Sequence, residues 1–256
     1  MEALKCIIKI IISPKEIFQK LKERPYIFTP LVLILISLFL VGIVSSSITQ
    51  ETQIKNLEKQ LEELEKQKDE EGIYLDKEQI EQMIKFIQSP LGLILGGVGK
   101  TIGGVIILLI SSFFFYLLAS LFGGNARFKH SFSLVAYSYV PFIFRNVLQA
   151  IYMFSTKKMI EPGLSFLVKN DQIFFRGILS SIDIFVIWHL FLLVLGFGIV
   201  FGLSRKKSIM IVGIYFFIVI LFSILGSSLE KISEKSYLME EVYPTEEALE
   251  EVPESY

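Results

Sequence analysis

The stretch that decides the fold class is DIFVIWHLFLLVLGFGIVFGL, residues 183–203. Apart from Asp183 and His189, its side chains are apolar or small. At 1.5 Å per residue a helix of this length extends roughly 30 Å, which matches the hydrocarbon core of a bilayer. The basic cluster Arg205-Lys206-Lys207 follows almost at once, as is common at the cytoplasmic end of a span. The pattern predicts a transmembrane helix.

The rest of the chain has the composition of a membrane protein. Of its 256 residues, 52% are hydrophobic and 23 are phenylalanine, which is more apolar surface than a soluble domain of this size usually carries. The only cysteine, Cys6, has no partner for an internal disulfide and is expected to be a free cytoplasmic thiol. The first apolar run is long enough to span, so we expect it to act as an uncleaved insertion signal.

Four further apolar runs predict an all-α integral membrane protein, a bundle of five transmembrane helices. The membrane domain covers residues 1–228, and the acidic residues 229–256 are expected to form a largely disordered tail with room for one short helix. From the positions of charges and turn residues, the spans are expected at residues 28–48, 101–122, 131–154, 182–203 and 208–228.

The segment before the first span mixes lysines with regularly spaced apolar residues. In residues 1–27 this spacing predicts an N-terminal amphipathic helix at the membrane interface, broken at Ser13-Pro14. Ser13 is expected to cap the second piece, and Pro14 suits its first turn. The apolar side of the helix can face either lipid or the protein's own spans, and the sequence leaves both open.

A second extramembrane segment, the insert at residues 51–90, is rich in acids. Ile54, Leu57, Leu61 and Leu64 fall at heptad spacing over about two heptads. This pattern predicts an extramembrane helical hairpin, with Asp69-Glu70-Glu71-Gly72 as its turn.

The distribution of charge predicts the orientation. Lysine and arginine are concentrated in the short segments 1–27, 123–130 and 204–207, whereas the insert and the tail hold most of the acids. Because cytoplasmic segments carry the excess of basic residues, we expect a cytoplasmic N-terminus and an external C-terminus in the cell membrane of a prokaryote. The basic residues on the expected inner side are Lys5, Lys9, Lys15, Lys20, Lys22, Arg24, Arg127, Lys129, Arg205, Lys206 and Lys207.

Ionisable residues within or beside the spans are candidates for function, because they are costly in a bilayer. They are Arg145, Asp183, His189 and Lys100. Arg145 could pair with Asp183, or each could hydrogen-bond to neighbouring helices. His189 is expected to be a neutral, hydrogen-bonded side chain more readily than a proton relay. Pro141 lacks a backbone donor, so a kink is expected there, with the carbonyl of Tyr137 released.

Glycines in the second span have two readings. Gly97-Val98-Gly99-Lys100-Thr101 resembles part of a phosphate-binding loop, but that motif requires a glycine where Ile94 stands, which argues against nucleotide binding. The pairs Gly92 with Gly96 and Gly99 with Gly103 instead predict small-residue faces for helix packing. We divide this region into a glycine-rich lead-in at residues 91–100 and the span itself.

The sequence does not favour catalysis. With two histidines and one cysteine, the usual metal-ligand spacings cannot be assembled. The sequence has no nucleophile-elbow or zinc-protease motif. We therefore expect a protein that is not an enzyme, with no cofactor, no metal site and no nucleic-acid partner.

Several short motifs in order along the chain resemble the prokaryotic branch of the YIP-domain (Ypt-interacting protein) family. They are Ser13-Pro14-Lys15-Glu16-Ile17-Phe18, Gly123-Gly124 with Phe128-Lys129, Ala136-Tyr137-Ser138-Tyr139-Val140-Pro141, and Ile187-Trp188-His189 with Gly196. The resemblance covers roughly residues 5–228 without the insert, and it implies five helical spans with a cytoplasmic N-terminus. Eukaryotic relatives bind Rab-type GTPases, but this chain lacks their Asp-Leu-Tyr-Gly-Pro motif, so that partner is not implied.

Two functions are compatible with these observations. The first is a non-enzymatic membrane-organising or interaction protein, which contacts anionic lipid through its basic N-terminus and contacts a membrane-protein partner or itself through its glycine faces. The alternative is a small-solute or ion transporter or channel subunit, suggested by Arg145, Asp183, His189 and the kink at Pro141.

Overall fold

The chain is helical throughout the part that the structure describes. The computed structural model describes residues 2–66, 77–125, 127–169 and 172–242, and contains no strand among them. The residues form two compact units: Met1–Ile160 with Phe185–Val212, and Glu161–Ile184 with Gly213–Tyr256. The elements in order are α1 (Glu2–Ile12), α2 (Pro14–Glu23), α3 (Phe28–Lys66), α4 (Lys77–Gln88), α5 (Pro90–Leu121), α6 (Phe128–Ser138), α7 (Val140–Thr156), η1 (Ser165–Leu167), α8 (Ile173–Ser180), α9 (Ile184–Val200) and α10 (Arg205–Val242).

Several of these helices are long and apolar enough to cross a membrane. In the described residues there are four, and a fifth if α8 and α9 together form one broken span. The class predicted from the sequence, a multi-pass helical membrane protein, is therefore confirmed, and the predicted count of five lies at the upper end of this range. The four are Phe28–Lys59, Pro90–Leu121, Phe128–Thr156 and Arg205–Leu229.

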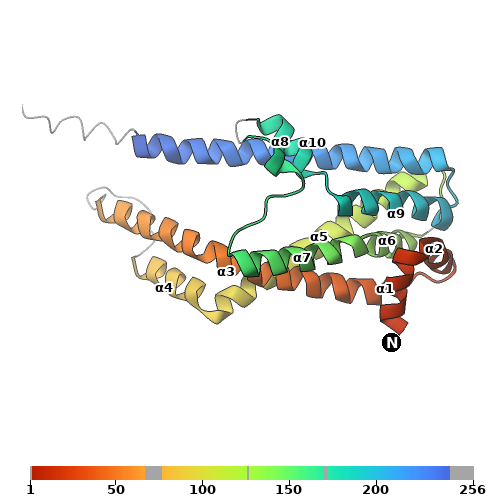
Figure 1. Cartoon of the computed structure of the whole chain (residues 1–256), viewed down its shortest axis with the longest axis horizontal. Coiled ribbons are helices and arrows are strands. Elements are labelled where there is room, and N and C mark those ends of the chain that lie inside the picture. The colour runs from red at the N-terminus through yellow and green to blue at the C-terminus, as the bar shows by residue number, and fades with distance from the viewer. Residues whose placement is uncertain (1, 67–76, 126, 170–171, 243–256) are drawn as a thin grey trace, which may run out of the picture. The chain divides into compact units, whose positions relative to one another are not determined.

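The first unit is built around α3, which packs along both α5 and α7 (Figure 1). Helix α5 also packs on α6, and α2 packs on α6 from the side of the N-terminal segment. Three large side chains from different helices, Phe18, Phe115 and Phe197, are fully buried in this unit. The rings of Phe115 and Phe197 lie 5.2 Å apart between centroids, so α9 contributes to the same core as α5.

Two helices run further than the predicted spans. Helix α3 continues without a break from Phe28 to Lys66, so the heptad region is its extension and not a separate helix. Helix α5 begins at Pro90, so the glycine-rich lead-in at residues 91–100 is part of the span helix, and the predicted division is wrong. The reason is a strong start signal: Ser89 accepts a hydrogen bond from the Gly92 amide at 3.1 Å, and Pro90 occupies the first turn.

The insert forms a helix pair made by the end of α3 and by α4. The two helices are packed together, and Ile80 of α4 is fully buried. Gln50 of α3 donates from Nε2 to the carbonyl of Ile87 at 2.7 Å, which joins the two near the membrane-facing end of α4. The predicted turn at residues 69–72 lies outside the described residues.

The N-terminal segment is two helices divided at Ser13-Pro14, as the sequence predicts. Pro14 lies in the first turn of α2, but Ser13 makes no side-chain capping bond, so that part of the prediction is wrong. The reason is local conformation: Ser13 has φ −137° and ψ 62°, outside the usual extended geometry of a capping residue.

The second unit contains η1, α8 and most of α10. The Leu164 amide donates to the carbonyl of Leu179 at 2.8 Å, which closes the η1–α8 segment on itself. Gly177 of α8 packs against the backbone of Ile224 in α10, where a Cβ would lie 2.6 Å from the Ile224 Cα. Helix α10 continues to Val242, beyond the predicted end of the last span and into the region expected to be largely disordered. The rest of the predicted tail, residues 243–256, lies outside the described residues.

Candidate functional site

The polar residues inside the spans of the first unit gather where α6 gives way to α7. Tyr139 separates the two helices, two residues before Pro141. Proline cannot donate to the preceding turn, and the Phe142 amide turns to the Tyr139 carbonyl at 2.9 Å instead of continuing the α-helical pattern. The carbonyl of Ser138 is thereby left available for a side chain.

His189 of α9 occupies that position. Its Nδ1 lies 2.7 Å from the Ser138 carbonyl oxygen, and because a carbonyl only accepts, Nδ1 must carry the proton and donate. The ring is 1% exposed and lies between two aromatic rings, with centroids 4.9 Å from Tyr139 and 4.8 Å from Phe142. The hydrogen bond expected of His189 is present, and its role as a structural side chain and not a proton relay stays a prediction. The helix is interrupted at Tyr139, near the predicted kink at Pro141, and the carbonyl that accepts from His189 is that of Ser138 and not that of Tyr137.

Arg145 lies one turn beyond the break, on α7. Its guanidinium carbon is 4.4 Å from the centroid of the Phe142 ring, a cation–π contact that compensates in part for the removal of the charge from water. The same ring lies 4.8 Å between centroids from that of His189. The structure therefore brings two of the predicted residues, Arg145 and His189, against one aromatic ring, whereas Lys100 lies on α5 with its Cβ beside Gly42 of α3. Asp183 belongs to the second unit, and its pairing with Arg145 stays a prediction.

A hydrogen bond between α7 and α3 adjoins this group. Asn146 donates from Nδ2 to Oγ of Ser37 at 3.2 Å, and the two residues are 7% and 3% exposed. A second hydrogen bond between helices joins α6 to α5, where Ser131 donates to the Ser112 carbonyl at 2.7 Å. Sequence reasoning did not single out these residues, although a serine in the middle of an apolar span and an asparagine next to Arg145 are signals of helix contact.

The close helix contact in the first unit is made by α3 and α5. A Cβ on Gly42 would lie 2.7 Å from the Cα of Gly97, so the two backbones touch at this point. The predicted packing residue Gly96 faces Ser46 of α3, and Gly92 faces the backbone of Phe86 and Ile87. Both glycines therefore lie at close contacts, Gly96 with α3 and Gly92 with the end of α4.

Gly99 and Gly103 make no close contact within the described chain, so their predicted packing role stays a prediction. No heavy atom of the described chain lies within 4 Å of a Cβ built on either. The residues that do face α3 are Gly97 and Gly104, seven positions apart on one side of the helix; a Cβ on Gly104 would meet Leu38. The glycines of α5 lie on more than one face, and their spacing alone does not show which face meets the neighbour.

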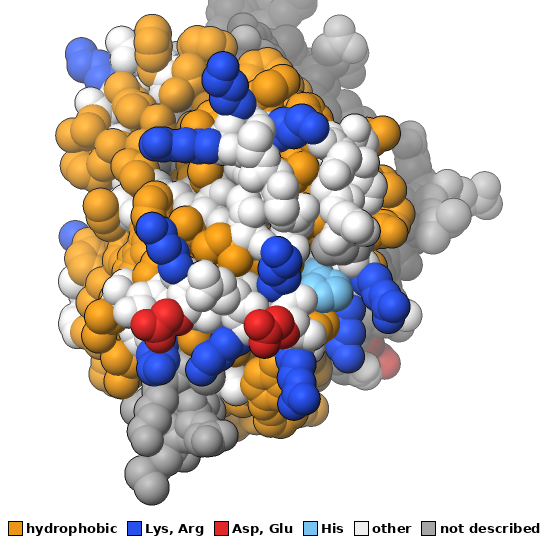
Figure 2. All heavy atoms as spheres, turned by 90° about the vertical axis from the view of Figure 1, so that its right-hand side faces the viewer, with side chains coloured by type: hydrophobic (Ala, Val, Ile, Leu, Met, Phe, Trp, Pro, Cys, Tyr) orange, Lys and Arg blue, Asp and Glu red, His pale blue; other side chains and the backbone are white. Residues whose placement is uncertain are grey.

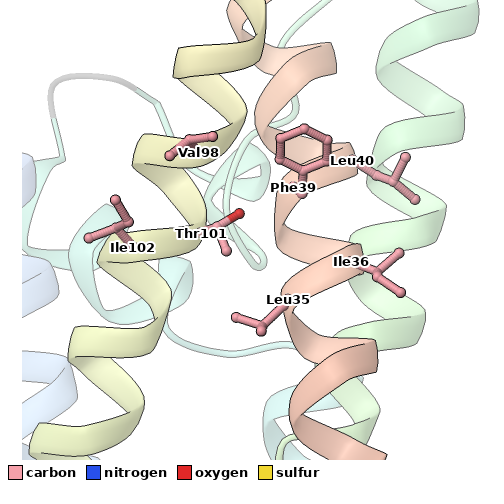
Figure 3. Close-up of a pocket in the computed structure, with 7 residues that line it drawn as sticks. All are labelled: Leu35, Ile36, Phe39, Leu40, Val98, Thr101 and Ile102. Carbon is pink, nitrogen blue, oxygen red and sulfur yellow. The ribbon is translucent and has the colours of Figure 1, made fainter.

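A hollow beside this contact has an apolar lining (Figure 3). Its volume is about 320 Å³. Thr101 is the one polar residue of the lining, and its hydroxyl already donates to the Gly97 carbonyl at 2.8 Å. The hollow therefore suits hydrocarbon and offers little to orient a polar solute. Its lining residues are Leu35, Ile36, Phe39, Leu40, Val98, Thr101 and Ile102.

The apolar helices and the polar contacts between them define a multi-pass helical membrane protein. Comparison with known proteins identifies its family: the Yip1 domain matches residues 8–227. The chain therefore belongs to the Yip1 domain family, as the motifs indicated.

A curated relative supports this assignment. The chain is 26% identical over 229 residues to a protein described as "Membrane protein YknW" from Bacillus subtilis (strain 168). The match covers 88% of this chain and 90% of the relative. No solved structure matches the chain.

Proposed function

We propose that this Yip1-family protein is a non-enzymatic membrane-organising or protein-interaction protein of a prokaryotic cell membrane. In this proposal the N-terminus is cytoplasmic and the C-terminus is outside. The observation that supports this proposal is that polar side chains in the spans form hydrogen bonds between helices. His189 binds the Ser138 carbonyl, and Asn146 binds Ser37, so these side chains hold helices together.

The extramembrane helix pair offers a surface for a protein partner. On α4, Met83 and Phe86 are 45% and 44% exposed, whereas Ile80, one turn before Met83, is fully buried. Large apolar side chains three positions apart on a charged, exposed helix form a contact face of the kind that partner helices use. We place the partner contact on this face.

Cross-linked pull-downs from native membranes test the proposal. Met83→Ser/Phe86→Ser changes the exposed apolar face of α4, and Glu81→Gln/Gln88→Ser is the matched control at exposed positions on the other side of the same helix. We expect a specific partner with the intact chain, its loss with the first variant and its retention with the control. Recovery of only bulk membrane proteins by the intact chain would contradict the proposal. Substitutions are preferable to deleting residues 1–27, because α2 buries Phe18 and Leu21.

A small-solute or ion transporter or channel subunit is the second candidate function. Lys100 and Arg145 are basic residues of candidate spans, and an anion pathway would need such charges. The test is flux of ions and solutes through vesicles containing the purified protein, with Arg145→Ala as the variant. Flux that Arg145→Ala abolishes would favour transport, whereas equal, background flux in both proteins would end this alternative.

A further inference from the structure

Three basic segments that are far apart in the sequence form one face of the first unit. They are the α1–α2 segment, the turn between α5 and α6, and the turn between α9 and α10. Figure 2 shows lysines and arginines spread over a face of the protein. We call this surface the basic end face. Its described cations, all exposed, are Lys9, Lys15, Lys20, Lys22, Arg24, Arg127, Lys129, Arg205, Lys206 and Lys207.

Direct contacts hold the three segments together. The Asn125 amide, in the α5–α6 turn, donates to the Phe201 carbonyl at 3.3 Å. Lys207 at the start of α10 donates from Nζ to the Phe122 carbonyl at 2.7 Å. Phe18 of α2 lies against Gly196, where a Cβ would be 3.2 Å from its ring. The segments are thus fixed relative to one another, and their charges add up on one surface.

The charge of this face is only slightly neutralised within the protein. Glu16 and Glu23 are the acids among the exposed residues of α2, and Glu16 forms an ion pair with Lys9 at 3.5 Å. Lys207 donates to the Phe122 carbonyl, and because that group has no net charge, the positive charge of Lys207 is not neutralised. A surface with so large an excess of cations attracts a polyanionic partner.

The two N-terminal helices have different roles at this face. Helix α2 buries Ile17, Phe18 and Leu21 and exposes its lysines, so it serves as a charged cover packed on the protein's own helices. Helix α1 buries Ile10 but leaves Ile12 74% exposed. The sequence left open whether the apolar side of this segment faces lipid or the protein's own helices. For α2, it faces the protein's own helices.

Helix α1 has a second apolar side that the protein does not cover. Ile8, Ile11 and Ile12 are 48%, 38% and 74% exposed and lie three and four positions apart, on one side of the helix. Figure 1 shows α1 running across the direction of α3, as a helix in the plane of the membrane surface would. An exposed apolar edge beside lysines, at the end of a bundle of spans, fits the boundary between headgroups and acyl chains.

We infer that the basic end face binds the headgroups of anionic phospholipids, with the isoleucine edge of α1 (Ile8, Ile11 and Ile12) inserted into the same leaflet. The inference rests on the proposed function and names the lipid class at its cytoplasmic side. An acidic protein segment would satisfy the charge, but it would leave the isoleucine edge in water. Lipid satisfies both.

Lipid selectivity of the full-length protein in vesicles tests the inference. The probes are spin-labelled phosphatidylglycerol and spin-labelled phosphatidylcholine, whose association with the protein is compared at low and high salt. We expect a preference for phosphatidylglycerol that weakens with salt. Lys15→Gln/Lys20→Gln/Lys22→Gln should reduce it at least about fivefold, the equivalent of one lysine contact at an anionic surface.

The matched control replaces three exposed lysines of the same unit away from this face, as Lys85→Gln/Lys157→Gln/Lys158→Gln. It should leave the preference unchanged. Equal loss in both triple variants, or no preference in the unmodified protein, would overturn the inference. Capture of an acidic protein by the basic end face without any lipid preference would overturn it as well. Failure of the α4 pull-down would not affect this measurement, so the two proposals fail separately.

The isoleucine edge has its own readout when a single cysteine is placed on it, as Ile8→Cys in a Cys6→Ser background, because Cys6 is the only native cysteine. An environment-sensitive dye on this cysteine should report an apolar surrounding in vesicles that contain phosphatidylglycerol. Adding Ile11→Ser/Ile12→Ser should shift the emission toward that of the dye in water. An unchanged emission would show that this edge does not insert.

Discussion

A methyl group added at Gly42 should push α3 and α5 apart. In Gly42→Ala the new carbon would lie 2.7 Å from the Cα of Gly97, 3.2 Å from its carbonyl oxygen and 3.1 Å from Cβ of Lys100. Carbon atoms pack best at about 3.5–4.0 Å. The first two obstacles are backbone atoms, which cannot rotate out of the way, so the helices must separate by roughly 1 Å at their closest point.

The size of the effect can be isolated with a matched substitution. Gly99→Ala adds the same methyl to a helical position of α5 with no described heavy atom within 4 Å. Both variants gain the same helix propensity, about 1 kcal/mol for alanine over glycine. The difference between them therefore reports overpacking, which typically costs ~1–3 kcal/mol. We expect Gly42→Ala to be less stable than Gly99→Ala by that amount.

Reversible unfolding in mixed micelles, with increasing denaturing detergent, measures both variants under the same conditions. Retained helicity before unfolding, monitored by far-ultraviolet circular dichroism, serves as the check that each variant has folded. If the two free energies of unfolding agree within about 0.5 kcal/mol, the usual range for surface substitutions, the close approach of α3 and α5 is refuted.

Three further predictions use the same unfolding assay. Gly123→Ala should lose about 1–2 kcal/mol, because φ of +83° is left-handed and this residue closes the last turn of α5; no loss would contradict that geometry. His189→Phe should keep the ring packing but leave the Ser138 carbonyl without its donor, at a cost of ~1–3 kcal/mol, and an unchanged stability would argue against the bond. A double-mutant cycle of Ser37→Ala and Asn146→Ala should give a coupling of about 0.6 kcal/mol, whereas strict additivity would show no interaction.

Local signals in the sequence were sufficient for the helix starts. Proline and serine mark the beginnings of α2 and α5, and the apolar run after Phe28 marks α3. The same signals, applied fully, also predict the uninterrupted α5, because Ser89 and Pro90 form a strong start. The division at residue 100 gave too much weight to one lysine, whose long side chain a span can accommodate.

The contacts between distant residues were less predictable. The Asn146–Ser37 bond joins positions 109 residues apart, and no periodicity within either helix specifies that pair. Likewise, the bond of His189 to the Ser138 carbonyl depends on which carbonyl the break exposes, which is set by the backbone of residues 138–142. Among the glycines of α5, the choice of Gly97 over Gly99 depends on the rotation of the helix against α3.

The basic end face combines both kinds of information. The sequence showed that basic residues concentrate in three short segments, and the rule for membrane orientation assigned these segments to one side. Their meeting on one surface depends on contacts such as that of Lys207 with the Phe122 carbonyl. The different roles of α1 and α2 at this face depend on which of their isoleucines are buried against the protein and which are exposed.

The most direct test of the account is the side of the membrane on which each end of the chain lies. In a Cys6→Ser background, single cysteines are introduced as Lys20→Cys on α2 and Ser255→Cys near the C-terminus, and intact cells are treated with a membrane-impermeant maleimide. An odd number of spans with a cytoplasmic basic end face predicts labelling of Ser255→Cys in intact cells and of Lys20→Cys only after permeabilisation. Labelling of both from the same side would contradict five spans, and labelling of Lys20→Cys alone in intact cells would contradict the orientation.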